Sequence, residues 1–180
     1  MRKFNAIVTA LLLVCFVLHG VLGALQMIGG SSIFLTPILG FVTLFCVLIH
    51  VVIGIKLTVD TLKIQKKTKA GYFKENRLFW ARRISGFAIL FFIVSHMTAF
   101  STRVDGGFVL RPFGADKLIL QICLVLCIAI HVISNAKPML ISFGIKSLKE
   151  RSFDILFVLS VLLLFMGAGF FVYFLYWRIV

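Results

Sequence analysis

Five long apolar runs decide what kind of fold this chain can adopt. They cover about residues 6–28, 34–56, 84–101, 117–136 and 154–177. A helix needs roughly 20 apolar residues to cross the hydrocarbon layer of a bilayer. The chain is also 61% hydrophobic and 14% charged, whereas a soluble domain is about half apolar and about a quarter charged. We therefore predict an all-α integral membrane protein with five transmembrane helices in a single membrane domain, residues 1–180.

The first run has a second interpretation. It follows Met1-Arg2-Lys3, and a small-residue stretch at Val21-Leu22-Gly23 resembles the cleavage site of a secretory signal. The run is long for a signal sequence and contains a histidine that matches others further along the chain. These features favour a retained helix.

The positive charges are distributed unevenly between the two ends of the predicted helices. Of 19 Lys and Arg residues, two precede the first run, nine lie between Lys56 and Arg83, and four lie between Lys137 and Arg151. Cytoplasmic loops carry an excess of Lys and Arg, so we predict a cytoplasmic N-terminus and an external C-terminus. The net charge of +13 then marks orientation, and no nucleic-acid partner is expected.

The longest predicted connection is a basic cytoplasmic loop, about residues 57–83. The simplest interpretation is a solvated loop whose charge sets the orientation. Juxtamembrane basic clusters also bind anionic lipid headgroups, and a connection of this length offers a docking surface for a cytoplasmic partner. It contains no catalytic motif.

Each of the first four runs contains one histidine: His19, His50, His96 and His131. A single intramembrane histidine is commonly explained by one interhelical hydrogen bond. Four of them in four helices indicate a shared functional site, because ionisable residues are costly inside a bilayer.

The depths of the histidines predict how they pair. At 1.5 Å per residue, His19 and His96 lie roughly 20 Å from the predicted cytoplasmic boundary, and His50 and His131 lie roughly 9 Å from it. We therefore expect an outer pair and an inner pair, roughly 10 Å apart along the membrane normal. The first four helices would form a bundle with each pair on one diagonal.

A planar macrocycle with an axial histidine on each face would fill each diagonal. We predict two haem b groups, because histidine is a common axial ligand of haem iron and no CxxCH motif for covalent attachment occurs. His19 and His96 are the predicted iron ligands of the outer haem, and His50 and His131 those of the inner haem. Zinc is a weaker candidate, since it would need four ligands at one depth.

Three of the four cysteines stand four residues before a histidine, in CFVLH (Cys15), CVLIH (Cys46) and CIAIH (Cys127); Phe92 takes this place in the third helix. Residues four apart share one helix face. One interpretation is that small residues leave room for a ring beside the ligand. The other is close helix packing, which also explains Gly167 and Gly169.

The stretch WARRISGFAILFFIVSHM adds a resemblance to a known family. Arg82 or Arg83, then Ser85-Gly86, then His96 resemble the basic residue, small-residue pair and ligand of the diheme cytochrome b subunit of succinate dehydrogenase and fumarate reductase. The five runs and the histidine pairing resemble that family over nearly the whole chain.

The resemblance implies roles for further residues. Haem propionates need cations or hydrogen-bond donors, and each of the following side chains has the alternative role of an interfacial anchor. The expected set is Lys56, Arg82, Arg83 and Lys137 at the inner haem, with Gly86 close to a cofactor, and Arg103 with Gln26 or Ser31 at the outer haem.

The resemblance also implies a function. Electrons would pass between a membrane quinone, expected to be menaquinone, and an iron-sulfur subunit with its flavoprotein on the cytoplasmic face of a bacterial inner membrane. The chain would be an enzyme only as a membrane subunit, with succinate and fumarate interconverted elsewhere. Some relatives have carboxylates where this chain has Thr36 and Ala129, so no transmembrane proton route is inferred.

Two other hypotheses stay open. The haems would serve equally well in the membrane anchor of another respiratory enzyme, such as a hydrogenase, formate dehydrogenase or nitrate reductase. A small transporter or proton channel with a histidine relay would require polar, water-lined helices, whereas these runs are rich in Leu, Ile, Val and Phe.

Overall fold

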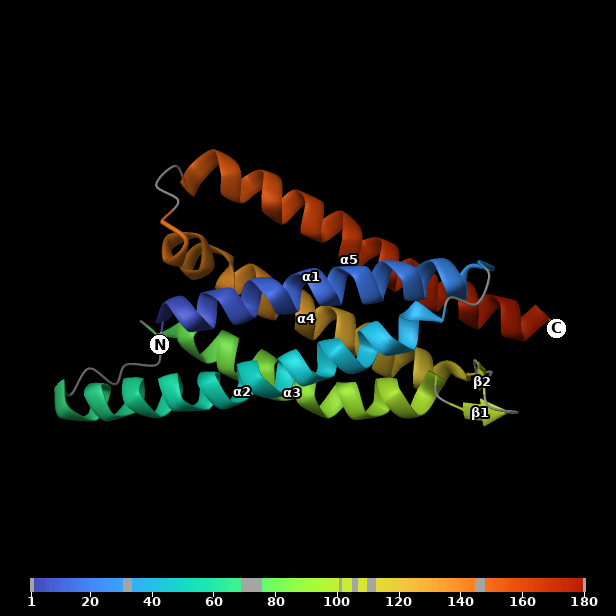
Figure 1. Ribbon diagram of the computed structural model, residues 1–180, viewed down its shortest axis with the longest axis horizontal. Coiled ribbons are helices and arrows are strands. Elements are labelled where there is room, and N and C mark those ends of the chain that lie inside the picture. Colours follow the sequence, from blue (N-terminus) through green and yellow to red (C-terminus); the bar gives the residue numbers. More distant parts are fainter. Residues whose placement is uncertain are drawn as a thin grey trace.

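The computed structural model describes residues 2–30, 34–68, 76–100, 102–104, 107–109, 113–144 and 148–179. In chain order, the elements are α1 (Arg2–Met27), α2 (Leu35–Thr68), α3 (Arg77–Phe100), β1 (Thr102–Val104), β2 (Gly107–Val109), α4 (Ala115–Ser142) and α5 (Leu148–Ile179). Successive helices run in opposite directions, so the two termini lie at opposite ends of the molecule (Figure 1). All five helices are long and apolar enough to cross a membrane, which confirms the predicted number of spans.

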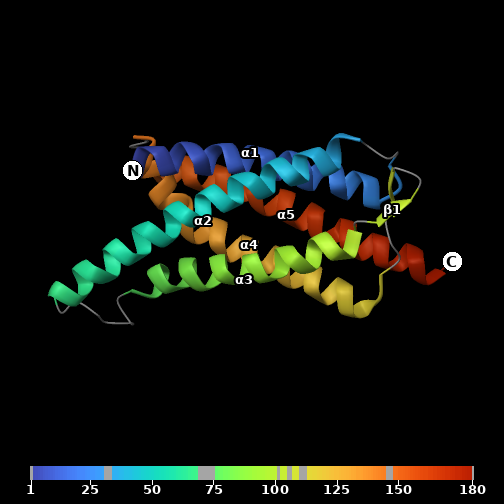
Figure 2. The same ribbon diagram turned by 60° about the horizontal axis from the view of Figure 1, so that its bottom comes forward.

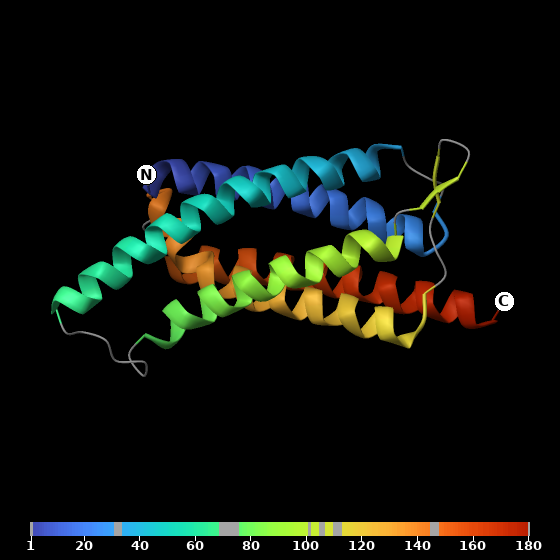
Figure 3. The ribbon, with the colours of Figure 1, turned by 90° about the horizontal axis from the view of Figure 1, so that it is seen from below.

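The helices pack as two hairpins with a fifth helix on one flank. α1 packs on α2, α3 packs on α4, and α5 lies against both α1 and α4. Figure 2 shows α5 behind the four other helices, and Figure 3 shows α1 and α2 on one side and α3 with α4 on the other. The first four helices therefore bring two hairpins face to face, with α5 covering one flank.

The predicted loop at 57–83 is wrong for most of its length. α2 continues through Thr68, and α3 already begins at Arg77. Lys, Gln and Leu are good helix formers, and Lys66 and Lys67 in the last turn of α2 complement the negative end of the helix dipole. With 34 residues, α2 is roughly 50 Å long, and its end projects beyond the neighbouring helices (Figure 1).

A short β-hairpin between α3 and α4 was not predicted. β1 and β2 pair in antiparallel fashion, with Arg103 opposite Phe108 and Val104 opposite Gly107. The dipeptide between the strands is Asp105-Gly106, which is among the strongest short-range signals for a hairpin. A search for spans alone overlooks it, because the strands have only three residues each.

The surface of the bundle is apolar on every helix. Examples of exposed large side chains are Leu11, Val52, Phe91, Ile130 and Leu164, the last of which is 74% exposed. Soluble monomers rarely expose contiguous apolar patches larger than a few hundred Å². Surrounding lipid would cover these faces, in agreement with an integral membrane protein.

The fifth helix is held by close contact with α1. A Cβ atom on Gly169 would lie 3.1 Å from Cβ and 3.2 Å from Cα of Ala24, and Ala24 is fully buried. Close packing therefore explains Gly169, as predicted. It does not explain Gly167, where an added Cβ would meet nothing within 4 Å.

We predict that Gly169→Leu weakens the α1–α5 contact, because the new side chain overlaps the backbone of Ala24. Overpacking of this kind typically costs about 1–3 kcal/mol. Thermal unfolding of the purified protein in detergent should show a lower midpoint for Gly169→Leu. Gly167→Leu is the matched control and should unfold like the unmodified chain; equal midpoints for the two variants would contradict the assigned contact.

Candidate functional site

The four histidine rings meet as two pairs. The ring centroids of His19 and His96 are 6.0 Å apart with an interplanar angle of 82°, and those of His50 and His131 are 6.2 Å apart at 85°. Each pair joins one helix of the α1–α2 hairpin to one helix of the α3–α4 hairpin. The structure thus has the ring pairing that the depths predicted, whereas the role of the rings as iron ligands stays a prediction.

The distance between paired rings suits a metal ion between them. A histidine nitrogen binds a metal at about 2 Å, and the centroid of the ring lies about 1 Å behind that nitrogen. Two imidazoles on opposite sides of one ion would therefore have centroids roughly 6 Å apart. All four rings are half-buried even though they face the interior of the bundle.

The Nδ1 atoms of the first pair are bound by oxygens that carry no proton. Nδ1 of His19 lies 3.0 Å from the backbone oxygen of Thr36 in α2. Nδ1 of His96 lies 2.9 Å from Oε1 of Gln121 in α4. A carbonyl oxygen only accepts hydrogen bonds, so both imidazoles carry their proton on Nδ1.

In the second pair, the Nδ1 atoms are bound by hydroxyl oxygens. Nδ1 of His50 lies 3.2 Å from Oγ1 of Thr9, and Nδ1 of His131 lies 3.1 Å from Oγ of Ser85. Both hydroxyls also contact the carbonyl oxygen four residues earlier, at 2.7 Å and 2.6 Å respectively. A hydroxyl has one proton to donate, and the shorter contact takes it. The hydroxyl oxygens therefore accept from the imidazoles.

The hydrogen-bond partners thus assign the same tautomer to all four imidazoles, with Nδ1–H as the donor and a lone pair on Nε2. This arrangement is typical of metal-binding histidines, whose second nitrogen is fixed by a hydrogen bond to a neighbouring oxygen. Each pair of rings therefore has two Nε2 atoms whose lone pairs are available to a metal ion. Chemically, the arrangement can bind a cationic metal centre between them.

The hydrogen bonds follow one plan in both hairpins. In the α1–α2 hairpin, each helix supplies one histidine and one oxygen that binds the histidine of the other helix, in the pairs Thr9–His50 and His19–Thr36. The α3–α4 hairpin has the same arrangement. Thr9 and His19 are ten residues apart in α1, so the two ring pairs lie on levels roughly 15 Å apart. The predicted separation of roughly 10 Å refers to the membrane normal and not to the helix axis.

Two glycines lie directly against histidine rings. A Cβ on Gly40 would lie 3.0 Å from Cε1 of His19, and a Cβ on Gly86 would lie 3.3 Å from Cε1 of His131. The lack of a side chain lets α2 and α3 approach these rings closely. Gly86 was predicted to lie near a cofactor, and it borders His131, a predicted ligand of that cofactor.

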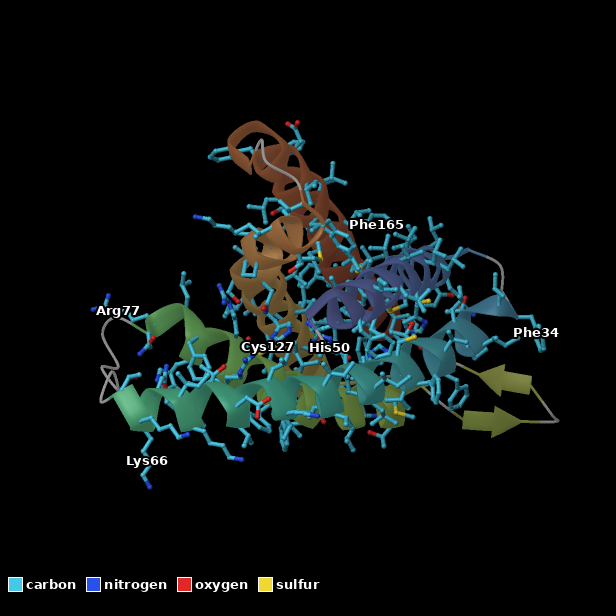
Figure 4. All side chains as sticks on the ribbon, turned by 60° about the vertical axis from the view of Figure 1, so that its left-hand side comes forward. Phe34, His50, Lys66, Arg77, Cys127 and Phe165 are labelled. Atoms are coloured by element: carbon cyan, nitrogen blue, oxygen red, sulfur yellow. The ribbon has the colours of Figure 1, made fainter. Side chains whose placement is uncertain are left out.

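The neighbours of the cysteines bear on the packing interpretation. Cys15 and Cys46 are buried and lie within hydrogen-bond reach of each other, between α1 and α2. Cys127 is half-buried near Cys123. Figure 4 shows Cys127 and His50 near the middle of the bundle. Because each of these cysteines precedes its histidine by four residues, all three stand between the two ring levels, and close helix packing explains Cys15 and Cys46.

Arg82 is fixed by the proline inside α4. Pro138 has no N–H group and leaves the carbonyl of Ser134 without its usual helical partner. Nε of Arg82 donates a hydrogen bond to that carbonyl oxygen at 2.8 Å. Because Ser134 follows His131 by three residues in α4, this bond holds the guanidinium of Arg82 close to the level of His131.

Arg83 is the strongest candidate to bind an anion. Its guanidinium lies 5.0 Å from the ring centroid of Phe79 and is close enough to interact electrostatically with His50 and His131. Its Nε atom is buried and has no hydrogen-bond partner. A buried donor of this kind requires an acceptor, and a carboxylate of a bound cofactor would supply one.

The remaining predicted cofactor residues have mixed outcomes. Lys56 and Lys137 are exposed near the ends of the His50 and His131 helices, where they can reach the membrane boundary. Gln26 lies near the end of α1. Ser31 lies outside the described residues, as does the side chain of Arg103 in β1.

The first ring pair has its own buried donors, and both are neutral. Oγ1 of Thr36 and Nε2 of Gln121 are buried without a hydrogen-bond partner. α5 closes this level, because the ring of Phe170 lies 6.2 Å from that of His96. The level of His50 and His131 has guanidinium groups nearby, whereas this level has amide and hydroxyl groups.

Sequence analysis missed Thr9, Gly40 and Gln121. Thr9 and Gln121 are polar residues inside apolar runs, a signal that marks interhelical hydrogen bonds. Gly40 shows no such signal, since only the register between α1 and α2 brings it to His19. Among the described residues, no three or more His, Cys, Asp or Glu side chains cluster to hold a metal ion, so a four-ligand zinc site is not formed there.

Comparisons of the chain with protein-family models, curated proteins and solved structures found no match. The site is therefore interpreted from its own geometry and from the resemblance noted in the sequence.

We predict that all four histidines of the purified protein without a bound metal are Nδ1–H tautomers at neutral pH. Long-range proton–nitrogen correlation spectra in detergent should show a pyridine-type Nε2 for each ring. Thr9→Val removes the acceptor at His50 and should permit the other tautomer there, while leaving the remaining three rings unchanged. Protonated Nε2 atoms in the unmodified chain would contradict the assignment.

Proposed function

We propose that the chain is a diheme cytochrome b that anchors a quinone-linked oxidoreductase in the membrane and transfers electrons across part of the bilayer. One observation carries this proposal: the four imidazoles form two close pairs, and the Nδ1 atom of every ring is bound by an oxygen of the neighbouring helix. Succinate dehydrogenase and fumarate reductase are the complexes that the sequence resemblance favours.

The tautomers argue against a purely structural role for the histidines. With the Nδ1 atoms bound by oxygens of the neighbouring helix, each Nε2 atom keeps a lone pair. Centroid distances of 6.0 Å and 6.2 Å suit an iron ion held by two histidines, and the half-buried rings leave surface for a macrocycle to contact.

A proton relay is a poorer explanation. It would have to pass protons through the Nδ1 side of each ring. At His19 and His96, the partners on that side are a backbone carbonyl and an amide oxygen, and neither releases a proton to a further group. Fixed imidazoles suit metal ligation better than repeated protonation.

When bound, each iron porphyrin would supply a one-electron redox couple. The chain would hold each iron through two histidines, exclude water with apolar helices, and neutralise a propionate carboxylate with Arg83. Lys56, Arg82 and Lys137 supply further positive charge at the same end of the bundle. Gly40 and Gly86 allow neighbouring helices to pack on the rings of the ligands themselves.

The proposed orientation places this basic end in the cytoplasm of a bacterium, with the C-terminus outside. The start of α1, the end of α2, the start of α3, the end of α4 and the start of α5 lie at one end of the bundle (Figure 3). Of the 19 Lys and Arg residues, 15 belong to these helix ends or to the sequence between them. An excess of Lys and Arg favours the cytoplasmic side. The end of α2 projects there and offers Lys63, Lys66 and Lys67 to a partner.

The partner proposed is an iron-sulfur subunit with a flavoprotein, and the proposed mobile substrate is menaquinone or a related quinone. This step rests on the sequence resemblance. The anchor of a hydrogenase, formate dehydrogenase or nitrate reductase would need the same two sites. Co-purification separates these cases, since a flavoprotein supports the first assignment and a molybdenum or nickel enzyme supports another.

The proposal predicts two b-type haems per chain, with one haem lost for each broken pair. His19→Ala and His96→Ala should give one and the same single-haem spectrum, and His50→Ala with His131→Ala should give the other. The measurement is haem content per chain together with reduced-minus-oxidised spectra of the purified variants. A preparation that contains no iron porphyrin, or a His19→Ala spectrum that matches His50→Ala, would contradict the proposal.

Arg83→Gln should weaken binding of the haem held by His50 and His131. A hydrogen bond to a charged group contributes about 1.5–3 kcal/mol, so the affinity of that site should fall by roughly tenfold to a hundredfold. Titration of haem into the haem-free protein measures the change. Arg77→Gln, an exposed position at the start of α3 (Figure 4), is the matched control and should have no effect.

A further inference from the structure

Gln121 is the most deeply buried polar side chain that the structure describes. It has 0% exposure and is the largest side chain below 2%. Transferring an amide from water into an apolar environment is unfavourable unless hydrogen bonds compensate, and Nε2 of Gln121 has no partner. A leucine or methionine of similar size would avoid this cost. The amide therefore needs an explanation beyond packing.

The one hydrogen bond of the amide points to that explanation. Oε1 accepts from Nδ1 of His96 at 2.9 Å. At the same level, the acceptor for His19 is the backbone oxygen of Thr36, which no side-chain substitution removes. Gln121 is thus the side chain through which the sequence controls the Nδ1 bonds of this pair.

The ring of His96 packs against two other rings. It lies 6.0 Å from the ring of His19 and 6.2 Å from that of Phe170, with interplanar angles of 82° and 80°. Removal of Oε1 of Gln121 would take away the acceptor that the structure shows for the Nδ1 proton, and the opposite tautomer would become accessible.

We propose that Gln121 is a positioning residue that fixes the Nε2 lone pair of His96 and sets the electron affinity of the His19–His96 site. This inference rests on the proposed function. A hydrogen bond from Nδ1–H raises the basicity of the ligating nitrogen. A more basic ligand stabilises ferric over ferrous iron, so loss of the bond should make this haem easier to reduce and more weakly bound.

Two substitutions at this position and one at the other pair test the proposal. Gln121→Met removes the acceptor and keeps the length of the side chain, whereas Gln121→Glu keeps an acceptor oxygen in either protonation state. Ser85→Ala is the matched control, because it removes one Nδ1 acceptor from the His50–His131 pair. Potentiometric titrations and electron paramagnetic resonance spectra of the holoprotein give the readouts, and the single-haem histidine variants assign each signal to its site.

For Gln121→Met, we expect a shift of about tenfold in the ferrous-to-ferric ratio at fixed potential, or about 59 mV upward for one electron. Haem affinity at the same site should fall by about 10–100-fold. Gln121→Glu should keep the potential at or below that of the unmodified protein. Ser85→Ala should move the other haem only.

The possible failures are distinguishable. Absence of haem from the unmodified protein would overturn the proposed function. Two haems in every variant, with the potential of the His19–His96 site unchanged in Gln121→Met, would overturn the role of Gln121 and leave the proposed function intact. An equal shift of both haems in Gln121→Met would also overturn the role, because it would indicate a general change in packing.

Discussion

The hydrogen bond between each imidazole Nδ1 atom and an oxygen on the neighbouring helix is the interaction on which the rest of the bundle depends. It holds α1 against α2 and α3 against α4, and it leaves the Nε2 lone pair of each ring for another partner. Inside a bilayer, no hydrophobic force drives helices together, so packing and hydrogen bonds determine the association. The bonds that hold each hairpin together are thus the same bonds that prepare the site.

The two hairpins repeat one arrangement. In each, the first helix supplies a hydroxyl near its start and a histidine further on; the second supplies an acceptor oxygen and then a histidine. Thr9 and His19 correspond to Ser85 and His96, and the Thr36 carbonyl corresponds to the Gln121 amide. Antiparallel neighbours of this kind automatically place one histidine from each hairpin on each level. Only two levels with two rings each are possible, which accounts for the absence of a larger ligand cluster among the described residues.

Sequence analysis predicted the spans and the pairing of rings, because both follow from hydropathy and from the rise of a helix per residue. It could not predict partners that depend on the register between helices. Gly40 reaches His19 only because α1 and α2 pack at one register, and nothing in the α2 sequence marks it. Register also brings Cys15 and Cys46 together between α1 and α2, which their regular spacing from the histidines does not predict. The prediction of a loop at 57–83 was wrong because hydropathy locates the membrane boundary and does not locate the end of a helix.

The two ring levels have different charged surroundings. Arg82 and Arg83 stand near the level of His50 and His131. Arginine is costly in hydrocarbon but tolerated where its long side chain can approach the boundary. The buried donors at the level of His19 and His96 are the neutral Thr36 hydroxyl and Gln121 amide. A bound carboxylate would therefore meet a cation at one level and neutral donors at the other, and two otherwise equivalent ring pairs become electrostatically unequal.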